Sequence, residues 1–382
     1  MRIAFLADGR SVHTVRWVRY FADRGYDVHL ITFTAKPIKG VKIHELRYFS
    51  KLAYPLRILE VRKAIKKIDP DILHAHYISH YGVYGALTGF HPLVLTPWGS
   101  DIMIEPQRSR IKRFFIGFAL KRADLVQIST KIGRKRLIEL GCDPRKMFVQ
   151  QWGVDTNKFS PKARSRSLRK SLGIDNVYSI LCARYWSPVS NVEVFIKAVP
   201  LVLKKTKNVK FIMLGGGPLG LKLEELARNL GVYEDILFVG RVPENEMPKY
   251  LASVDLYVDT YSGFRGDIPG RIIVVRETSG VSQTTRQAMA CGTPQILSDR
   301  PGTKSLDWVC GVTYRPLDHR DLAETIVQLL KNAKTRGFIG KKSRKNALEI
   351  FDQEKVMKQW EVVYHKLKSY KHAKRKNDSA LS

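Results

Sequence analysis

The segment SGVSQTTRQAMACG (279–292) carries the sharpest chemical signal in the sequence. A small, polar turn that contains glycine opens a predicted helix here, so free backbone amides and hydroxyls gather at a helix N-terminus. Such an end favours negative charge and suits a phosphate group. Arg184, at the end of the predicted strand 179–184, is a candidate counter-charge, and a surface salt bridge is its alternative interpretation. Together these features indicate a site for a diphosphate.

A second glycine-rich turn, Gly215–Gly220, matches the GxGxxG pattern of dinucleotide-binding proteins. It follows the predicted strand 209–215, and Asp235 lies twenty residues beyond Gly215, which fits an NAD site. The ribose-binding acid should end the next strand, however, and Asp235 comes before the predicted strand 236–240. We therefore favour a turn in which glycine lets the backbone approach a ligand closely.

Histidines gather in the first half, where His74, His76 and His80 are close together and His91 follows. A zinc site needs a coherent ligand face, and no HExxH pattern occurs. We favour histidines of a cleft or of the core over metal ligands. Asp69-Pro70-Asp71 has DxD spacing, but its proline and its position before a strand indicate a turn.

Alternating strands and helices must position these residues. The predicted strands are 2–7, 27–33, 71–77, 93–99 and 124–129 in the first half, and 179–184, 209–215, 236–240 and 255–261 in the second. This alternation predicts an α/β protein with two doubly wound, Rossmann-like domains, each a parallel sheet covered on both faces. Ligands bind such sheets at the carboxyl ends of the strands, so we expect the two domains to face each other across a shared cleft.

The predicted domain organisation follows from a change in composition. The N-terminal domain spans 1–160, and the C-terminal domain spans 174–350. The polar, basic segment 161–173 has no strand pattern and is predicted to be the linker. A C-terminal helix is expected at 351–373, followed by a basic, flexible tail at 374–382.

The composition adds a strong bias in charge. Over 382 residues, 66 Lys and Arg oppose 35 Asp and Glu, so the net charge is +31. This surplus predicts an anionic partner, namely a membrane surface, a nucleic acid or a phosphorylated ligand, and a generally basic surface without one partner is the alternative.

The cysteines and the hydropathy indicate the compartment. The four cysteines are far apart and form no CxxC pair, which fits a reduced compartment without structural zinc. The N-terminus lacks the pattern of a signal peptide, and no stretch of about 18 apolar residues occurs. We therefore expect a cytoplasmic protein whose membrane contact is peripheral.

With these motifs in order, the sequence resembles the large family of retaining GT-B glycosyltransferases, which includes sucrose synthases and mannosyltransferases. The likeness covers nearly the whole chain. Its motifs are the turn after the first strand, HAHY (74–77), WGSD (98–101), GVDTNKFSP (153–161), ARYW (183–186), LGGGPL (214–219), FVGRVP (238–243) and QAMACGTP (287–294). The resemblance implies transfer of a sugar from a nucleotide-sugar to a glycan or lipid-linked acceptor with retention of configuration. It implies no obligatory metal, and no cofactor besides the nucleotide-sugar co-substrate.

The resemblance also implies a set of site residues. The acceptor is expected near Gly9, and the catalytic residues are expected to be Asp101, His13 and Ser279. The resemblance implies that the domain 1–160 is the acceptor side and that the domain 174–350 binds the nucleotide-sugar. The donor-binding residues are expected to be Gly9, Arg184, Gly216, Arg241, Ser279, Gly280, Val281, Ser282 and Gln287.

Several positions depart from the family pattern. A lysine about six residues after Arg184 is Ser190 here, and the histidine before Gly-Ser-Asp is Trp98. The acidic pair of the family corresponds to Ser279 and Gln287. Because these changes remove charge-assisted contacts, a homologue that binds a nucleotide or glycan without turnover is the alternative function.

The segment 263–277 lengthens the loop before this site. Glu277 lies two residues out of register with the first missing acid and is a candidate to substitute for it. Arg265, Arg271 and Arg276 are candidates to replace the missing lysine as phosphate contacts.

The segment 107–122 interleaves basic and apolar residues at helical spacing. Its basic residues are Arg108, Arg110, Lys112, Arg113, Lys121 and Arg122, and its apolar residues include Ile111, Phe114, Phe115 and Phe118. A helix of this kind lies on an anionic membrane surface. The equal alternative is that the apolar stripe packs in the core and the basic residues are solvated.

Nucleic-acid binding is the second alternative function suggested by the charge. The sequence shows no RRM, KH, helix-turn-helix or zinc-finger signature, and its basic residues are scattered over both halves. We therefore do not expect nucleic acid as a partner.

Overall fold

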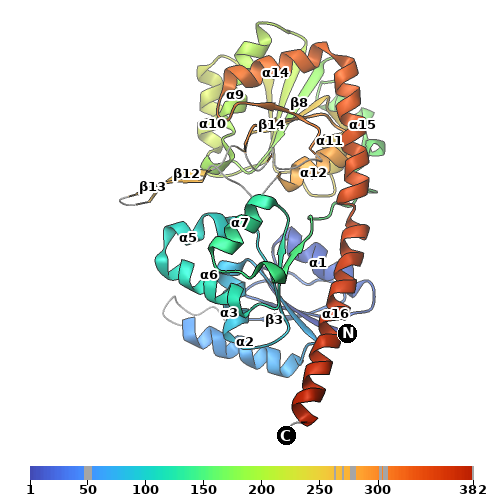
Figure 1. Cartoon of the computed structure of the whole chain (residues 1–382). Helices are drawn as coiled ribbons and strands as arrows, with labels where there is room; N and C mark the ends of the chain where they lie inside the picture. The colour runs from blue at the N-terminus through green and yellow to red at the C-terminus, as the bar shows by residue number, and fades with distance from the viewer. Residues whose placement is uncertain are drawn as a thin grey trace. The chain divides into compact units, whose positions relative to one another are not determined.

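The computed structural model divides the chain into two compact units, which we describe separately (Figure 1). It describes residues 1–46, 54–261, 264–268, 271–275, 281–300, 303 and 309–380, with no side chains for 54–56, 264–268, 271–275 and 372–380. Unit 1 comprises Met1–Gln150 and Met357–Ser382, and unit 2 comprises Gln151–Val356.

Unit 1 contains a seven-stranded parallel sheet in the order β3-β2-β1-β4-β5-β6-β7. Its strands are β1 (Arg2–Leu6), β2 (Asp27–Thr32), β3 (Val41–Glu45), β4 (Ile72–His76), β5 (Leu93–Thr96), β6 (Leu125–Ile128) and β7 (Met147–Val149). The chain adds β2 and β3 on one side of β1 and then returns to its other side with β4, which is the winding of a Rossmann-like sheet. The central strand β4 is buried along its whole length, as expected for a strand covered on both faces.

Helices of unit 1 follow its strands in the chain. They are α1 (Val12–Ala22), α2 (Tyr54–Ile68), η2 (Ile78–Gly82), α3 (Val83–Leu87), α4 (Ser100–Met103), α5 (Glu105–Arg108), α6 (Arg110–Arg122), α7 (Lys131–Glu139) and η3 (Pro144–Lys146). Serine caps start two of them, because the side chain of Ser11 accepts a hydrogen bond from the amide of His13, and that of Ser109 from the amide of Lys112.

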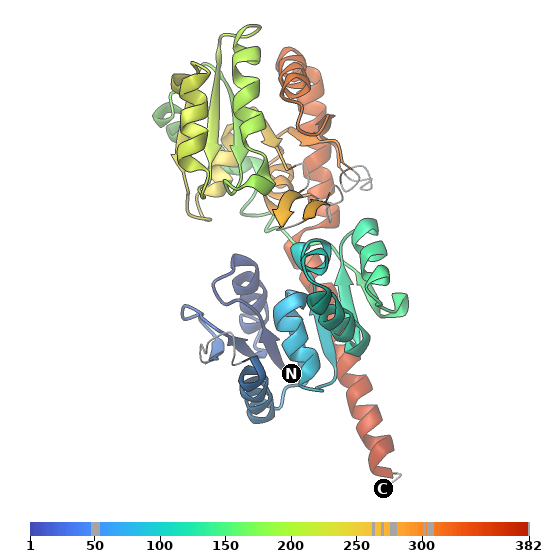
Figure 2. The ribbon, with the colours of Figure 1, turned by 90° about the vertical axis from the view of Figure 1, so that its left-hand side faces the viewer.

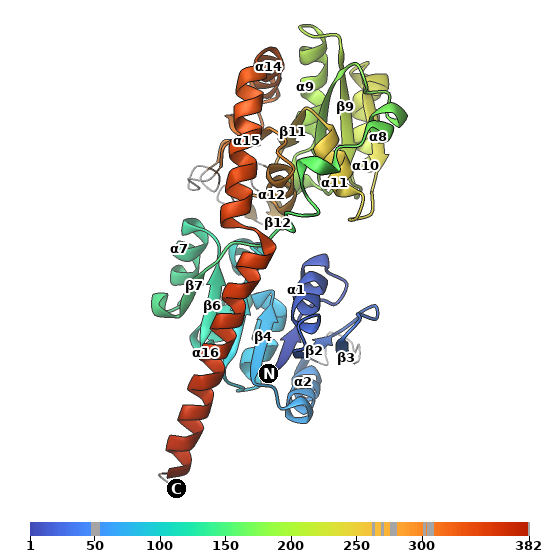
Figure 3. The same cartoon turned by 90° about the vertical axis from the view of Figure 1, so that its right-hand side faces the viewer.

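The C-terminal helix α16 (Gln353–Ala380) returns to unit 1 and lies along it (Figure 3). Trp360 is fully buried, with its ring centroid 5.3 Å from that of Trp17 and 5.1 Å from that of His74. The helix is therefore part of the core of unit 1. The C-terminal helix was predicted to end at 373, but the backbone stays helical to Ala380. Flexibility of the segment from 374 onward stays a prediction.

Unit 2 contains a six-stranded parallel sheet in the order β10-β9-β8-β11-β14-β15, seen from a second side in Figure 2. Its strands are β8 (Tyr178–Ala183), β9 (Val209–Leu214), β10 (Ile236–Gly240), β11 (Leu256–Asp259), β14 (Gln295–Ser298) and β15 (Val312–Tyr314). The order has the same winding as unit 1, with β8 and β11 as neighbours at the centre.

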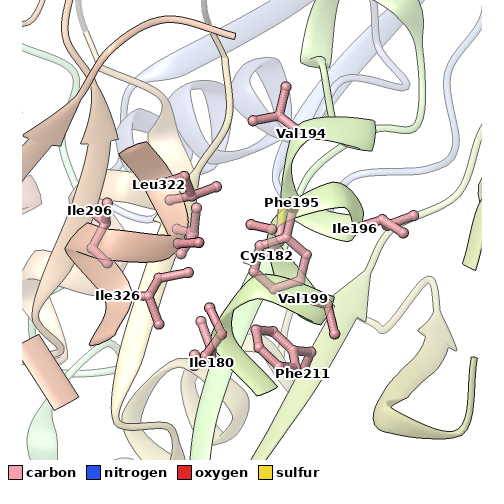
Figure 4. Packing of buried hydrophobic residues seen from close by; sticks show 14 of the residues in the cluster. Ile180, Cys182, Val194, Phe195, Ile196, Val199, Phe211, Ile296, Leu322 and Ile326 are labelled. Carbon is pink, nitrogen blue, oxygen red and sulfur yellow. The ribbon is translucent and has the colours of Figure 1, made fainter. Parts of the chain in front are cut away.

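Helices cover both faces of this second sheet. They are η4 (Pro161–Ala163), α8 (Arg166–Ser171), η5 (Pro188–Ser190), α9 (Glu193–Leu203), α10 (Gly220–Asn229), η6 (Tyr233–Asp235), α11 (Met247–Ser253), α12 (Gln283–Ala290), α14 (His319–Lys331) and α15 (Ala333–Ile350). Alternate residues of β8 belong to two separate cores. Ile180 and Cys182 pack with Phe195 of α9 and Ile326 of α14 (Figure 4), whereas Leu181 packs in a cluster with residues of α11, α12 and α15.

The segment 161–173, predicted to be the linker, belongs instead to unit 2, and the division falls after Gln150. Arg169 of α8 is 7% exposed, and its Nη1 donates to the carbonyl of Ser253 over 2.6 Å. The basic composition concealed this contact, because an arginine that satisfies buried carbonyls has the same sequence pattern as an exposed one.

The predicted fold class, two doubly wound Rossmann-like sheets, is confirmed. The long segment 263–277 contains an antiparallel hairpin, β12 (Phe264–Ile268) and β13 (Arg271–Val275), which the sequence analysis treated as a loop. Within the residues that the structure describes, no helix is long and apolar enough to cross a membrane.

Candidate active site

The carboxyl ends of β8 and β11 form the point in unit 2 where the strand order reverses. Doubly wound sheets bind ligands in the crevice that opens at such a reversal. Arg184 directly follows β8, and Asp259 is the last residue of β11. Because the two strands are hydrogen-bonded neighbours, these side chains come from adjacent positions on one edge of the sheet.

Arg184 and Asp259 form a buried ion pair at this edge. The Arg184 Nη1 lies 3.6 Å from the Asp259 Oδ1, and the side chains are 14% and 2% exposed. Burial by itself raises the pKa of the Asp259 carboxyl, but the guanidinium groups of Arg184 and Arg300 outweigh burial and hold it below its usual value. Asp259 is therefore ionised at neutral pH and orients the arginine.

Asp259 also connects β11 to the N-terminus of α12. Its Oδ2 accepts hydrogen bonds from the hydroxyls of Ser282 (2.9 Å) and Thr285 (2.7 Å), and its Oδ1 accepts one from the amide of Tyr261 (3.1 Å). Ser282 is the N-cap of α12, and its Oγ accepts from the amide of Thr285 over 3.0 Å. The predicted donor residues Arg184 and Ser282 are thus joined through a shared carboxylate.

Arg300 supplies a second buried cation from the next strand end. It follows β14, the other neighbour of β11, and is 4% exposed. Its Cζ lies 4.8 Å from the ring centroid of Tyr261, and the Cζ of Arg184 lies 5.0 Å from the same centroid. Cation–π attraction of this kind holds both guanidinium groups beside one ring.

The glycine-rich turn after β9 packs against the loop that follows β8. Gly215 has a φ of 140°, and a Cβ there would lie 1.8 Å from the carbonyl oxygen of Arg184. Gly217 has a φ of 159°, and its Cβ would lie 2.4 Å from the carbonyl oxygen of Trp186. Glycine is therefore required at both positions for the two loops to meet.

Gly216 and Arg241, two further predicted donor residues, also lie close together. A Cβ on Gly216 would be 2.9 Å from the Nε of Arg241. Arg241 follows β10, and its Cζ is 5.7 Å from the ring centroid of Tyr185. Asp235 lies in η6 at the other end of β10, as the sequence indicated, so the geometry does not favour the dinucleotide interpretation.

The remaining donor predictions have mixed outcomes. Val281 and Gln287 are each 6% exposed and belong to the segment around α12. Ser279 and Gly280 lie outside the described residues, as do Arg276 and Glu277. Arg265 and Arg271 fall in β12 and β13, whose side chains also lie outside the description.

The catalytic prediction Asp101 is fully buried at the carboxyl ends of β4 and β5 in unit 1. Its Oδ2 accepts from the amide of Ile78 (2.7 Å), and its Oδ1 accepts from the amides of Trp98 (3.0 Å) and Gly99 (2.9 Å). Burial raises the pKa of this carboxyl to about 6 against the opposing effect of these bonds. The geometry favours a residue that positions the two loops over one that contacts a substrate.

His13 and Gly9 lie on the loop and helix that follow β1. The His13 ring centroid is 5.8 Å from that of Trp98, so the helix start faces the loop held by Asp101. The amide of Gly9 donates to the Thr32 Oγ1 over 2.9 Å, and a Cβ on Gly9 would lie 2.5 Å from the Cβ of Ala35. Glycine at position 9 therefore allows the two loops to pack closely, and its amide is hydrogen-bonded to Thr32 within unit 1.

The paired histidines of β4 belong to the core. His74 and His76 are fully buried, and the Nε2 of His74 lies 2.7 Å from the Thr96 Oγ1. Burial lowers the pKa of His76 to about 3 and lowers that of His74 well below its usual value, so both rings are neutral. Within the described part of the chain, no group of three or more His, Cys, Asp or Glu side chains is arranged to hold a metal ion.

Sequence reasoning missed Asp259, Tyr261 and Arg300. The strand 255–261 was recognised, but its polar end was not connected with Arg184. The order of a doubly wound sheet makes its first and fourth strands neighbours, and this rule would have placed Asp259 beside Arg184.

Two family models match the chain in order. "Glycosyl transferase 4-like" matches residues 2–130, and "Glycosyl transferases group 1" matches residues 177–332. These matches fall on unit 1 and unit 2 respectively.

Curated relatives share about a quarter of their residues with this chain. The N-acetyl-alpha-D-glucosaminyl L-malate synthase of Bacillus anthracis is 23% identical over 374 residues, which cover 91% of each chain. A GDP-mannose-dependent alpha-(1-6)-phosphatidylinositol monomannoside mannosyltransferase of Mycolicibacterium smegmatis is 26% identical over 269 residues, which cover 68% of this chain and 66% of the relative.

Solved structures share the fold over almost the whole chain. Anabaena HepE in complex with UDP has a TM-score of 0.80 at 19% identity, with 96% of this chain and 100% of that chain covered. The sucrose-phosphate synthase of Thermosynechococcus elongatus has a TM-score of 0.75 at 16% identity, with 97% and 100% covered.

Proposed function

Because this chain belongs to the GT-B glycosyltransferase family, we propose that it transfers a sugar from a nucleoside-diphosphate donor to a hydroxyl of a glycan or lipid-linked acceptor. The buried pair of Arg184 and Asp259 beside the N-terminus of α12 carries the proposal. A cation that is already oriented, next to a helix N-terminus, suits a diphosphate. Anabaena HepE, which has this fold, was solved with UDP and with UDP-glucose.

The proposed reaction exchanges one bond at the anomeric carbon. The bond from this carbon to the diphosphate oxygen breaks, and its electron pair leaves with the nucleoside diphosphate. The acceptor oxygen forms the new bond on the same face, and its proton passes to the leaving diphosphate. Arg184 stabilises the negative charge that develops on that group, which is an electrostatic contribution that needs no metal. Retention of configuration is the outcome that the resemblance implies.

Unit 1 is proposed to bind the acceptor. The loops after β4 and β5, which Asp101 holds, and the start of α1 at His13 supply polar groups at the carboxyl edge of its sheet. His13 and Ser279 stay predicted catalytic residues, and Asp101 is proposed to act by positioning the loops.

The face of α6 is proposed to dock on anionic lipid. Ile111 and Phe114 are 70% and 69% exposed, whereas Ile116, Ala119 and Leu120 on the same helix are fully buried. The six basic residues of the segment, Arg108, Arg110, Lys112, Arg113, Lys121 and Arg122, are all exposed. Two exposed apolar side chains among cations suit the interface of a negatively charged bilayer. This surface would bring the enzyme to a lipid-linked acceptor at the cytoplasmic face of the membrane.

A homologue that binds its ligand without turnover is the second candidate function. It is favoured by Gln287, a neutral, buried side chain at a position where the resemblance implies a carboxylate. Ser279 replaces the other acid. This candidate shares the donor site and differs only in the absence of sugar transfer.

Titration with UDP, GDP and ADP, followed by thermal unfolding, tests the donor site. A nucleotide at about 100 times its dissociation constant should stabilise the protein by about 2.7 kcal/mol. Arg184→Ala should abolish the shift, and Arg336→Ala is the matched control, because Arg336 donates to the carbonyl of Leu329 at the end of α14. Absence of binding by the wild type would overturn the proposal. Binding without transfer from UDP-glucose, UDP-N-acetylglucosamine or GDP-mannose to a panel of acceptors would favour the second candidate.

Sedimentation with lipid vesicles tests the proposed membrane face. Binding to vesicles that contain phosphatidylserine should fall strongly in the double variant Ile111→Ser/Phe114→Ser and at high salt. Leu221→Ser, at a side chain of unit 2 that is 85% exposed, is the control for loss of an apolar group. Equal vesicle binding by the wild type, the double variant and Leu221→Ser would contradict this part of the proposal.

A further inference from the structure

We propose that Arg300 binds the diphosphate of the donor together with Arg184, an inference that rests on the proposed function. Three adjacent strand ends supply the site: Arg184 after β8, Asp259 at the end of β11, and Arg300 after β14. The central strand carries the acid, and its neighbour on each side carries a guanidinium group. The topology therefore places two cations at one edge of the sheet.

The ring of Tyr261 holds the two guanidinium groups near each other. Their Cζ atoms lie 5.0 Å and 4.8 Å from its centroid. The charge of each guanidinium group also acts on Asp259, and that of Arg184 acts on Arg300, so we place both groups at one diphosphate beside the N-terminus of α12. A planar guanidinium group matches two phosphate oxygens at once, which a lysine ammonium does not.

Asp259 cannot by itself satisfy both arginines. A carboxylate accepts about four hydrogen bonds, and a guanidinium group has five N–H donors. Three bonds to Asp259 already come from Ser282, Thr285 and the amide of Tyr261. Its charge acts on both guanidinium groups, but its remaining acceptor capacity is small. One carboxylate charge therefore faces two guanidinium charges, and this balance favours a ligand of high negative charge at this edge of the sheet.

Burial increases what Arg300 contributes. Its side chain is 4% exposed, and charge–charge attraction is stronger where water is largely excluded. Burial also lowers the pKa of this guanidinium, and the carboxylate of Asp259 opposes the effect. If Arg300 only balanced the charge of Asp259, folded variants at position 300 would keep the affinity of the wild type for pyrophosphate.

The test compares Arg300→Gln, Arg300→Lys and Arg184→Gln with the wild type by isothermal titration calorimetry. The probes are inorganic pyrophosphate, whose binding does not depend on a base, and UDP, GDP and ADP with their monophosphates. Arg300→Gln should weaken pyrophosphate and the preferred nucleoside diphosphate by about tenfold or more, as expected for loss of a charge-assisted contact. The monophosphate should lose less affinity, and Arg300→Lys should fall between wild type and Arg300→Gln.

Controls separate binding from folding. Arg336→Gln removes the same charge from the other end of the sheet and should leave the affinity for pyrophosphate unchanged. If Arg300→Gln unfolds, Arg300→Lys keeps the charge and still reports the loss of the bidentate geometry. Unchanged affinity for pyrophosphate in folded Arg300→Gln or Arg300→Lys would overturn the inference and leave Arg300 with a structural role.

Failure of the inference differs from failure of the proposed function. If the wild type and Arg184→Gln behave as proposed but the Arg300 variants bind normally, only the role of Arg300 is wrong. If the wild type binds neither pyrophosphate nor any nucleoside diphosphate, the donor site itself is wrong.

Discussion

Replacing Arg184 by methionine should destabilise unit 2 through Asp259. The substitution retains much of the apolar volume of the side chain and removes the guanidinium group 3.6 Å from a carboxylate that is 2% exposed. Asp259 keeps its hydrogen bonds to Ser282 and Thr285 but loses one of its two cations. The variant thus isolates the charge pair from the hydrogen bonds.

The expected loss follows from the burial and the remaining partner. Breaking an isolated buried ion pair costs about 3–5 kcal/mol. Arg300 still acts on Asp259, and the 3.6 Å separation is long for a charge-assisted hydrogen bond, so we expect a loss of roughly 2–3 kcal/mol. For a unit of this size the melting temperature should fall by roughly 4–12 °C.

A double-mutant cycle measures the pair directly. Urea unfolding of Arg184→Met, Asp259→Asn and the double variant gives the coupling free energy. Because the uncompensated carboxylate causes the loss, the double variant should be more stable than Arg184→Met alone. A cycle in which the two losses simply add would refute the reasoning, since the two side chains would then act independently.

The pH dependence of the free energy of unfolding tests the role of Asp259 independently. The pKa of Asp259 is lowered in the folded protein, so its stabilisation is fully present above the unfolded value of 3.8 and is lost as the pH falls through the folded value. Arg184→Met raises that pKa. The difference in stability between the wild type and this variant should therefore narrow below about pH 4. A constant difference from pH 7 to pH 3 would contradict the assigned role.

Three further predictions concern other parts of the fold. Gly215→Ala should lower the free energy of unfolding by more than about 1 kcal/mol, because the new Cβ would lie 1.8 Å from a carbonyl oxygen. The control is Gly231→Ala, where φ is 67° and no atom lies within 4 Å of the new Cβ, so this variant should show only the smaller backbone cost. Asp101→Asn should destabilise unit 1 by about 1–3 kcal/mol at neutral pH. Because the pKa of Asp101 is raised to about 6, its contribution to stability falls as the pH rises from about 4 to 6. The free energy of unfolding, measured over this pH range, should show the decrease in the wild type and not in the variant. Trp360→Ala should cost about 3–5 kcal/mol in unit 1, and a loss below 1 kcal/mol in chemical unfolding would contradict the burial of α16.

The sequence was sufficient for the fold class and for some residues of the candidate site. Alternating strands and helices predicted two doubly wound sheets, because apolar strands of this length must be covered on both faces. The helix start at Ser282 and the arginine after β8 were identified from residue types alone, since caps and helix ends depend on local contacts. Ser282 is indeed the cap of α12.

Longer-range features were not predictable from local pattern. The segment 161–173 was assigned to a linker, although the burial of Arg169 makes it part of unit 2. The return of α16 to unit 1 depends on aromatic contacts between Trp360 and residues more than 250 positions earlier in the chain, such as His74. Asp101 has the residue type of a catalytic acid, and only its three backbone partners indicate a positioning role.

The sequence by itself determined most of the strands of the two sheets and predicted that one helix start favours an anion, because these properties depend on neighbours within a few residues. Only the tertiary structure decided that Asp259 lies between Arg184 and Arg300. The three residues are distant in the chain and meet because β8, β11 and β14 are adjacent in the sheet. Strand order depends on how the whole sheet is covered, so the charge balance of the proposed donor site is a property of the fold and not of any one segment.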